Sequence, residues 1–393
     1  MKIGMLSEFY YPQPGGISEH LRALSRQLRL RGHEVQILTS NIRGNVVERD
    51  PGIRRLGRSL AVPYNGSLSR ISLGWRLSRH FDRLLEEEQF DLIHIHNPYM
   101  PTLPLLALSR AKCPLVGTFH SNFSMDPLIW LFQRPLRRLL ARQKAGIAVS
   151  EAARLAAEPL CPGEHPIIPN GVDFSFFEEI ARQGGDSFSG LDSSKKKILF
   201  VGATVRRKGL PYLLKAFERL RQDRDDLELI VVGDGPDRRR IQRKIPQQLR
   251  DDIHFVGFVP RGKLAEYYAS ADIFCAPSLG QESFGMVLLE AMAAGLPVVG
   301  FDIEGYRDVV SHERDGLLVP PRDELALAEA LDRLLATPEE CIRFGRAGQL
   351  KAESMDWSRI AERVESVYYE VLGLSLHQEE LPFESRAKSV GSS

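Results

Sequence analysis

Two carboxylates eight residues apart carry the strongest chemical signal in the chain. Glu282 and Glu290 flank a Ser-Phe-Gly turn that precedes apolar residues with helical spacing. Eight helical steps of about 100° bring Glu290 close to the side from which Glu282 enters, so both carboxylates can face one cleft. Amides at a helix N-terminus favour phosphate, and carboxylates accept hydrogen bonds from sugar hydroxyls. The motif predicts a nucleotide-sugar site, although an ordinary amphipathic helix with a solvated Glu at each end has the same spacing.

Two further motifs offer contacts for phosphate. Gly15 and Gly16 follow the first predicted strand, where paired glycines let the backbone approach a ligand closely. Arg206, Arg207 and Lys208 follow another predicted strand, and we expect Lys208 to neutralise charge on a departing diphosphate. Neither motif has the glycine spacing of dinucleotide-binding or P-loop proteins, which argues against nicotinamide and ATP chemistry. A plain tight turn and a solvated basic turn are the alternatives.

Three histidines occupy two neighbouring predicted strands. His94 and His96 share one face of a strand, and His120 ends the next one, so a three-imidazole zinc site is one interpretation. Buried strand histidines more often form hydrogen bonds, and no acidic or Cys residue is spaced to help bind an ion. We therefore predict no metal site and no cofactor. His120, at the end of its strand, is interpreted as a donor to the substrate.

Short apolar runs alternate with helical patterns along the chain, which predicts α/β architecture with two doubly wound parallel sheets. The predicted strands are residues 2–6, 33–40, 90–96, 114–120 and 145–150, then 197–202, 227–233, 253–259, 271–277, 296–302 and 316–320. We assign residues 1–185 to an N-terminal domain and 195–356 to a C-terminal one, with a polar boundary between them. The helix at 357–373 is expected to cross back to the N-terminal domain. The polar tail, 377–393, is expected to be disordered.

Composition and charge indicate where the protein is located and which kinds of partner it binds. No run of about 18 uncharged apolar residues occurs and no signal peptide is evident, so we predict a cytoplasmic protein. The four cysteines are far apart in sequence, which argues against a disulfide framework or structural zinc. Residues 1–173 hold 22 Lys and Arg against 15 Asp and Glu, while the rest hold 30 against 36. The basic half fits an anionic partner such as a membrane surface, and no nucleic-acid-binding module is recognisable.

One segment of the basic half has the pattern of a membrane-surface element. The apolar run 128–132 is followed by cations with leucines between them. These cations are Arg134, Arg137, Arg138, Arg142 and Lys144. We expect the segment to lie on an anionic bilayer, although Pro135 interrupts a single helix. A core-facing helix with a solvated basic side is the alternative.

These motifs together resemble those of retaining glycosyltransferases of family GT4, whose GT-B fold has two Rossmann-like domains. The resemblance covers residues 1–372 and is closest to the phosphatidyl-myo-inositol mannosyltransferases. The segments that carry it are 14–16, 63–67 with Arg70, 94–96, 118–120, 147–150, 169–173 and 282–295.

The resemblance implies roles for individual residues. Gly16 and Lys208 would hold the donor diphosphate, Glu290 the ribose, and Glu282 the transferred hexose. His120 would contact the sugar and help order the active site. Further donor contacts would come from Ser283, Phe284 and Gly285. The acceptor's inositol phosphate headgroup would be received by Tyr64, Asn65, Ser67 and Arg70, with Arg70 supplying charge-assisted hydrogen bonds.

Two departures from the family pattern matter. Ala203 stands where the family usually has an Arg, so we expect Arg206 or Arg207 to reach the diphosphate instead. No acidic residue in 257–263, where the base would dock, is placed to accept from guanine. The predicted activity is transfer of a hexose, with GDP-mannose as first choice, to an inositol phospholipid at the inner face of the plasma membrane. A soluble UDP-sugar transferase, a nucleotide-sugar epimerase and a non-enzymatic sugar-nucleotide binder are the alternatives.

Overall fold

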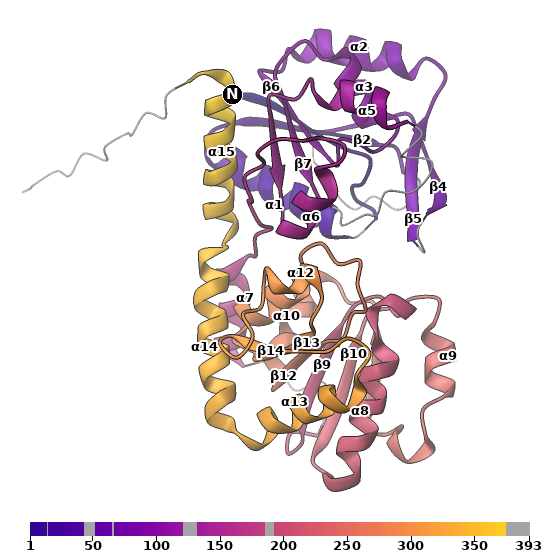
Figure 1. The fold of residues 1–393 in the computed structure, drawn as a ribbon, viewed down its shortest axis with the longest axis vertical. Helices are drawn as coiled ribbons and strands as arrows, with labels where there is room; N and C mark the ends of the chain where they lie inside the picture. Colours follow the sequence, from indigo (N-terminus) through magenta and orange to yellow (C-terminus); the bar gives the residue numbers. More distant parts are fainter. Residues whose placement is uncertain (14, 43–51, 65–66, 121–131, 185–191, 375–393) are drawn as a thin grey trace, which may run out of the picture.

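Two parallel β-sheets, one in each half of the chain, form the framework of the molecule (Figure 1). The computed structural model describes residues 1–13, 15–42, 52–64, 67–120, 132–184 and 192–374, with backbone alone for 61–64 and 67–70. The predicted apolar segment 128–131 and the tail 377–393 lie outside these residues. The prediction of two doubly wound α/β domains is confirmed.

The N-terminal sheet has six parallel strands. Their order is β3 (Ile53–Leu56), β2 (Glu34–Ser40), β1 (Lys2–Ser7), β6 (Leu92–His96), β7 (Leu115–Phe119) and β8 (Ala145–Ala148). The helices within the described residues of this half are α1 (Gly16–Leu30), α2 (Leu77–Glu88), α3 (Leu103–Arg110), α5 (Gln133–Leu140) and α6 (Glu151–Ala157). An antiparallel hairpin of β4 (Arg58–Tyr64) and β5 (Ser67–Leu73) precedes α2.

The C-terminal sheet repeats this order. Its strands are β11 (Ile253–Gly257), β10 (Leu227–Val232), β9 (Lys196–Val201), β12 (Ile273–Ala276), β13 (Val298–Phe301) and β14 (Gly316–Val319). Its helices are α8 (Leu210–Asp223), α9 (Arg238–Arg243), α10 (Arg261–Ser270), α11 (Met286–Ala293), α12 (Glu304–Arg307) and α13 (Glu324–Ala336), with short 3-10 turns η1 (Arg206–Lys208) and η2 (Gln247–Leu249). Each predicted strand is present within about two residues of its predicted ends, whereas β3 and the β4–β5 hairpin were not predicted.

Strand order determines where a ligand can enter. In each sheet the winding reverses between the first strand and the fourth parallel strand, that is, between β1 and β6 and between β9 and β12. Ligands of open parallel sheets bind beyond the carboxyl ends of the strands at such a switch point. The loops that follow β1, β6, β9 and β12 are therefore the places where function is expected. They contain Gly16, Asn97, Lys208 and Glu282.

Three helices connect the two halves. Helix α7 (Phe174–Gln183) contacts α10 and α11 of the C-terminal domain. Helices α14 (Pro338–Ser354) and α15 (Trp357–Leu372) run along one edge of the molecule, and α15 lies beside α1 (Figure 1). Trp357, Val364 and Tyr368 of α15 are buried in the same cluster as the leucines of α1. Glu365 accepts hydrogen bonds from Arg31 at 2.8 Å and contacts His33 at 2.5 Å. The end of the chain thus packs on its beginning.

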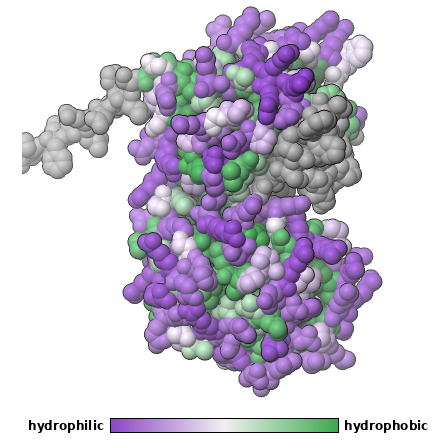
Figure 2. All heavy atoms as spheres, viewed as in Figure 1, coloured by the Kyte–Doolittle hydropathy of each residue, from purple (hydrophilic) through white to green (hydrophobic). Residues whose placement is uncertain are grey.

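The surface is mainly hydrophilic on the face drawn in Figure 2, with hydrophobic residues in small patches. Among the described residues, no helix has the length and apolar character needed to cross a bilayer. A few large hydrophobic side chains are nevertheless exposed. In the N-terminal domain these include Trp75, of which 88% is exposed, and Phe132, of which 56% is exposed.

Gly171 lies against Trp357 at the start of α15, where a side chain has no space. A Cβ atom at Gly171 would lie 2.6 Å from the indole ring. We predict that Gly171→Ala lowers the stability of the protein by about 1–3 kcal/mol through overpacking. The midpoint of thermal unfolding, followed by circular dichroism, measures this change. Gly262→Ala is the matched control, because no atom lies within 4 Å of its Cβ, and an equal loss in both variants would contradict the packing argument.

Candidate active site

Lys208 and Glu282 meet where the loops after β9 and β12 touch. Gly209, which follows η1, has a left-handed φ of 70°, and a Cβ there would lie 1.7 Å from the Pro277 carbonyl oxygen. Only glycine allows this approach. As a result, Lys208 Nζ lies 2.9 Å from Glu282 Oε1, and the Arg207 guanidinium donates to the same oxygen. The predicted phosphate cation and the predicted sugar carboxylate are therefore in direct contact.

The Glu282 carboxylate is ionised because of its neighbours. Its side chain is 13% exposed, and burial alone would raise the pKa of this carboxyl. The positive charges of Lys208 and Arg207 outweigh burial and hold the pKa below its ordinary value of 4.5. Glu282 is thus a charged acceptor, as required for hydrogen bonds from sugar hydroxyls.

A hollow of about 310 Å³ opens beside Glu282. It is lined by the loop residues Gly280, Gln281 and Glu282 and by the segment Asp302–Gly305 with Arg307. Its volume is at the lower end of the range for small-molecule pockets. The α12 helix on its wall contacts α6 of the N-terminal domain, and Asp308 accepts a hydrogen bond from the Glu151 amide at 3.1 Å. The hollow therefore lies close to the domain interface.

Glu290 has different partners from Glu282. The Ser-Phe-Gly turn opens α11 as predicted, because Gly285, with a φ of 83°, directly precedes Met286. One turn along that helix, the Glu290 carboxylate accepts a hydrogen bond from the Tyr268 hydroxyl at 3.0 Å. Burial raises the pKa of Glu290, and the nearby Arg261 and the Tyr268 hydroxyl oppose that rise only in part. The two carboxylates thus lie in opposite electrostatic environments.

Arg261 links the Glu290 region to the N-terminal domain. Its guanidinium donates to Glu19 of α1 at 2.8 Å, and it lies over the Phe177 ring. Burial would lower the pKa of Arg261, but Glu290, Glu19 and Asp173 together raise it. The ion pair therefore joins α10, whose Arg261 also feels the charge of Glu290, to the helix that begins at Gly16.

Two helix N-termini lie close together at this interface. A Cβ atom at Gly16, the first residue of α1, would lie 3.5 Å from the Met286 sulfur at the start of α11. Helix N-termini carry a partial positive charge and unsatisfied amides, so they favour an anion. Gly16, predicted to hold the donor diphosphate, thus lies at one of the two converging N-termini. Ser283 lies in the turn before α11, whereas the Phe284 side chain is buried in the core and Arg206 is exposed.

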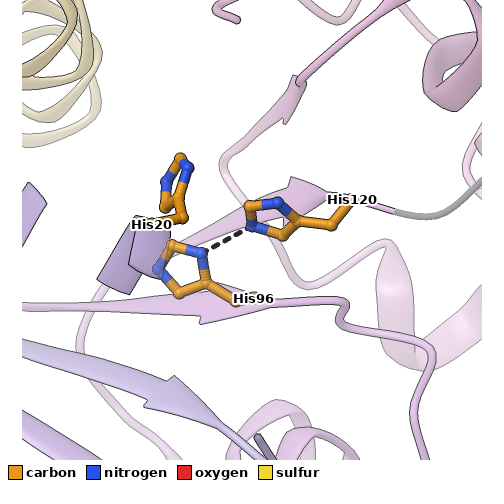
Figure 3. Close-up of side chains that lie close together, drawn as sticks. All are labelled: His20, His96 and His120. Atoms are coloured by element: carbon orange, nitrogen blue, oxygen red, sulfur yellow. Dashed lines mark hydrogen bonds between the residues drawn. The ribbon is translucent and has the colours of Figure 1, made fainter. Parts of the chain in front are cut away.

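His120 belongs to a buried group of imidazoles at the carboxyl ends of β6 and β7 (Figure 3). His96 Nδ1 lies 2.9 Å from His120 Nε2, and the His120 amide donates to Asn97 Oδ1 at 2.8 Å. His20 of α1 packs edge-on against the His120 ring, with centroids 4.6 Å apart. Burial lowers the pKa of His20 to about 4, and burial together with the neighbouring histidines lowers the pKa of His96 and His120 well below 6.5. The group is therefore neutral at pH 7.

The four predicted acceptor residues belong to the β4–β5 hairpin and its turn. Asn65 lies outside the described residues, and only the backbone of Tyr64, Ser67 and Arg70 is described. The base of the hairpin is held by Glu8, which follows β1. Glu8 accepts hydrogen bonds from the Ser72 hydroxyl at 2.7 Å and from the Leu103 amide at 2.7 Å. Burial raises the pKa of Glu8, and hydrogen bonds from Thr102, Ser72 and Leu103 lower it in part.

Several residues of this region were not singled out in the sequence. Their roles depend on contacts between segments that are distant in sequence. These residues are Glu19 and its ion-pair partner Arg261, His20, and Glu8. His20 alone left a signal, because it shares the buried face of α1 with Leu24 and Leu28. A polar side chain on the buried face of a helix needs a hydrogen-bond partner, and His20 has one in Asn170 at 2.7 Å.

Comparison with known proteins agrees with this architecture. Residues 14–176 match the family described as Glycosyltransferase Family 4, and residues 186–351 match the one described as Glycosyl transferases group 1. The phosphatidyl-myo-inositol mannosyltransferase of Mycobacterium leprae is 34% identical over 369 residues, which cover 94% of this chain and 96% of the relative. That of Mycolicibacterium smegmatis is 32% identical over 394 residues and covers both chains completely. The chain belongs to glycosyltransferase family 4.

One further relative of this glycosyltransferase and two solved structures have names other than phosphatidyl-myo-inositol mannosyltransferase. The D-inositol 3-phosphate glycosyltransferase of Xylanimonas cellulosilytica is 30% identical over 409 residues, covering 93% of this chain and 96% of that one. Among solved structures, the sucrose-phosphate synthase of Thermosynechococcus elongatus has a TM-score of 0.76 at 24% identity and covers 95% of this chain and all of its own. Anabaena HepE in complex with UDP has a TM-score of 0.74 at 20% identity, with 94% and 100% covered. These structures confirm the GT-B fold.

The two glutamates of the 282–290 motif are predicted to affect the stability of the ligand-free glycosyltransferase in opposite directions. At pH 7 the folded state favours the charged form of Glu282 and disfavours that of Glu290. We therefore expect Glu282→Gln to lower the thermal unfolding midpoint and Glu290→Gln to raise it, by roughly 2–4 °C for each 1 kcal/mol.

The pH dependence of the two effects also differs. The stability contributed by Glu282 is present above its unfolded pKa of about 4.5 and is lost as pH falls through its lower folded pKa. The penalty from Glu290 exists above its raised folded pKa and disappears as pH falls through it. Thermal midpoints of both variants and the parent, followed from pH 8 to well below pH 4, measure this. A change of the same sign in both variants at pH 7 would contradict the electrostatic assignment.

Proposed function

We propose that this glycosyltransferase transfers a hexose, with mannose from GDP-mannose as first choice, to a phosphatidylinositol-type lipid at the cytoplasmic face of the membrane. The observation that carries the proposal is the contact of Lys208 with Glu282 beside the hollow at the β12 loop. The names of the mannosyltransferase relatives support the lipid acceptor and the sugar.

The donor fits the charges around the domain interface. A nucleotide-sugar diphosphate requires cations and amides, which Lys208, Arg207 and the N-termini of α1 and α11 can supply. Glu282 would then accept from hexose hydroxyls, and Glu290 from the ribose. Arg207 also accounts for the departure at Ala203, because its guanidinium already reaches the Glu282 oxygen that Lys208 contacts. We assign Arg207 the second diphosphate contact.

The proposed reaction retains the configuration of the sugar. The acceptor hydroxyl oxygen attacks the anomeric carbon from the face that the diphosphate leaves. The bond from that carbon to the phosphate oxygen breaks, and the leaving diphosphate takes the acceptor proton. Lys208 and Arg207 would stabilise the negative charge that develops on the leaving group. Neutral His120 would hold the sugar by a hydrogen bond.

Membrane association has support from exposed side chains in the N-terminal domain. Trp75 follows the hairpin expected to receive the headgroup, and Phe132 precedes α5. Arg134, Arg138 and Lys144 are exposed in or after α5, whereas Leu140 of the same helix is fully buried. The segment therefore combines the two interpretations of its sequence. Its leucines pack inward, and Arg137 and Arg142 donate to backbone carbonyl oxygens. The remaining cations face solvent, where anionic lipid can bind.

Lys208→Ala is predicted to lower turnover by about 10²–10³-fold, as loss of one oxyanion donor does in other enzymes. The expected cause is uncompensated charge on the leaving diphosphate. Release of radiolabelled mannose from GDP-mannose into the lipid phase measures the rate. Lys215→Ala is the control, because Lys215 is exposed on α8, where it pairs with Glu324 at 2.9 Å. Equal rates for both variants would contradict the role of Lys208.

A soluble UDP-sugar transferase remains the second candidate, because one relative is named a D-inositol 3-phosphate glycosyltransferase. We predict sugar transfer to phosphatidylinositol vesicles and at least a tenfold lower rate with soluble inositol phosphate. Parallel assays with GDP-mannose and UDP-glucose identify the donor, and NMR of the product gives its anomeric configuration. Transfer from UDP-glucose to inositol phosphate alone would favour the soluble candidate. An inverted product would contradict the proposed chemistry.

A further inference from the structure

Three imidazoles from three separate elements converge next to the site described above. His20 lies on α1, His96 ends β6 and His120 follows β7, and all three are buried (Figure 3). One ring nitrogen of each lies within 4.8 Å of the corresponding nitrogens of the other two. The sequence suggested His94 as the third member, but His94 hydrogen bonds to Tyr368 at 2.7 Å and Thr118 at 2.6 Å. Both of its ring nitrogens are occupied, so His20 takes its place.

His20 has the protonation pattern of a metal ligand. The Asn170 side-chain oxygen can only accept, so His20 Nδ1, 2.7 Å away, carries the ring proton. Its Nε2 therefore bears a lone pair, and this buried atom has no hydrogen-bond partner among the described residues. Metal-ligating histidines commonly donate their other ring N–H to an oxygen in this way, which fixes the tautomer. His96 Nε2 is also buried without a partner in the described part of the chain, so it can carry the ring proton when Nδ1, the nitrogen that faces His120, binds an ion.

We propose that His20, His96 and His120 form a binding site for a divalent transition-metal ion of the zinc class. Imidazole nitrogen suits Zn²⁺, Co²⁺ and Ni²⁺, whereas Mg²⁺ and Ca²⁺ prefer oxygen ligands that this group does not offer. Three imidazoles with an open fourth position are a known arrangement for Zn²⁺.

Small movements of the three side chains would bring their ring nitrogens to the separations found around a tetrahedral zinc ion. Zn–N bonds of about 2.0–2.1 Å in a tetrahedron place ligand nitrogens roughly 3.3 Å apart. His96 Nδ1 and His120 Nε2 are 2.9 Å apart, so they would separate slightly to admit the ion. The His20 ring would move inward, and the 4.8 Å limit keeps this movement small. The ligands themselves are neutral, so an anion at the fourth position would offset the charge of the ion in this buried setting.

Occupancy would regulate the enzyme. The ion takes the His120 nitrogen, so His120 would no longer orient toward a hexose. This consequence rests on the proposed function of His120, whereas metal binding itself does not. Zn²⁺ therefore inhibits hexose transfer, and removal of the ion by a chelator restores it.

The test uses the full-length protein stripped of metal with a chelator. Calorimetric titration with Zn²⁺ is expected to show one ion per chain, and Co²⁺ is expected to produce the visible absorption of a tetrahedral site. His20→Gln should abolish both signals. Asn170→Ala should weaken Zn²⁺ binding about 10–100-fold, as loss of an outer hydrogen bond does. His312→Gln is the matched control, because His312 is half exposed and remote in sequence from the group.

X-ray absorption at the zinc edge of the unaltered protein needs no variant, so it remains decisive if His20→Gln does not fold. Three imidazole nitrogens in the first shell support the proposal. Fewer than three, no bound ion at one equivalent, or binding unchanged in folded His20→Gln would overturn it. Zn²⁺ should inhibit mannosyl transfer by the parent and leave His20→Gln insensitive. Metal binding without any sugar transfer would uphold the site and contradict the proposed function, so the two failures are distinguishable.

Discussion

The active site depends on one constraint: two parallel sheets must keep their switch points close together. Each sheet delivers its ligand loops at the carboxyl ends of its strands, but neither sheet alone holds a complete set. The relative position is set by α15, which packs on α1, and by the contact of α12 with α6. Trp357 and Tyr368 bury their rings against the N-terminal domain, so the tie is largely hydrophobic. The polar contacts across the interface add to this hydrophobic packing.

In the ligand-free protein, the charges of the site neutralise each other. Lys208 and Arg207 pair with Glu282, while Arg261 pairs with Glu19 near Glu290. A bound diphosphate would replace Glu282 as the partner of Lys208 and Arg207. The cations that it would contact are therefore already ion-paired in the ligand-free protein. The net gain on binding is therefore a difference between two ion-paired states, as expected where charges are partly buried. Under the proposed function, this exchange would link donor binding to the domain interface, because Glu19 and Arg261 come from different domains.

The sequence was sufficient for the architecture, and it placed Lys208 and Glu282 at strand ends that meet in the fold. Apolar runs of β-branched residues placed the strands, since buried parallel strands have near-continuous hydrophobic sequences. Strand β3 and the β4–β5 hairpin were missed because Arg54, Arg55, Ser67 and Ser69 interrupt that pattern. The Lys208–Glu282 contact was foreseeable, since both residues follow strands whose ends meet at one switch point. The Glu19–Arg261 pair was not, because the relative position of two domains depends on packing that no local pattern encodes.

The histidine group shows how a correct local argument can select an incomplete set of residues. Spacing along β6 and β7 brought His94, His96 and His120 together, but alternation along a strand cannot say which ring nitrogens are already bonded. In the fold, Tyr368 from α15 and Thr118 from β7 occupy His94. His20 arrives from α1, with Asn170 fixing its tautomer. The same packing of α15 that joins the domains therefore decides which histidines remain available for chemistry.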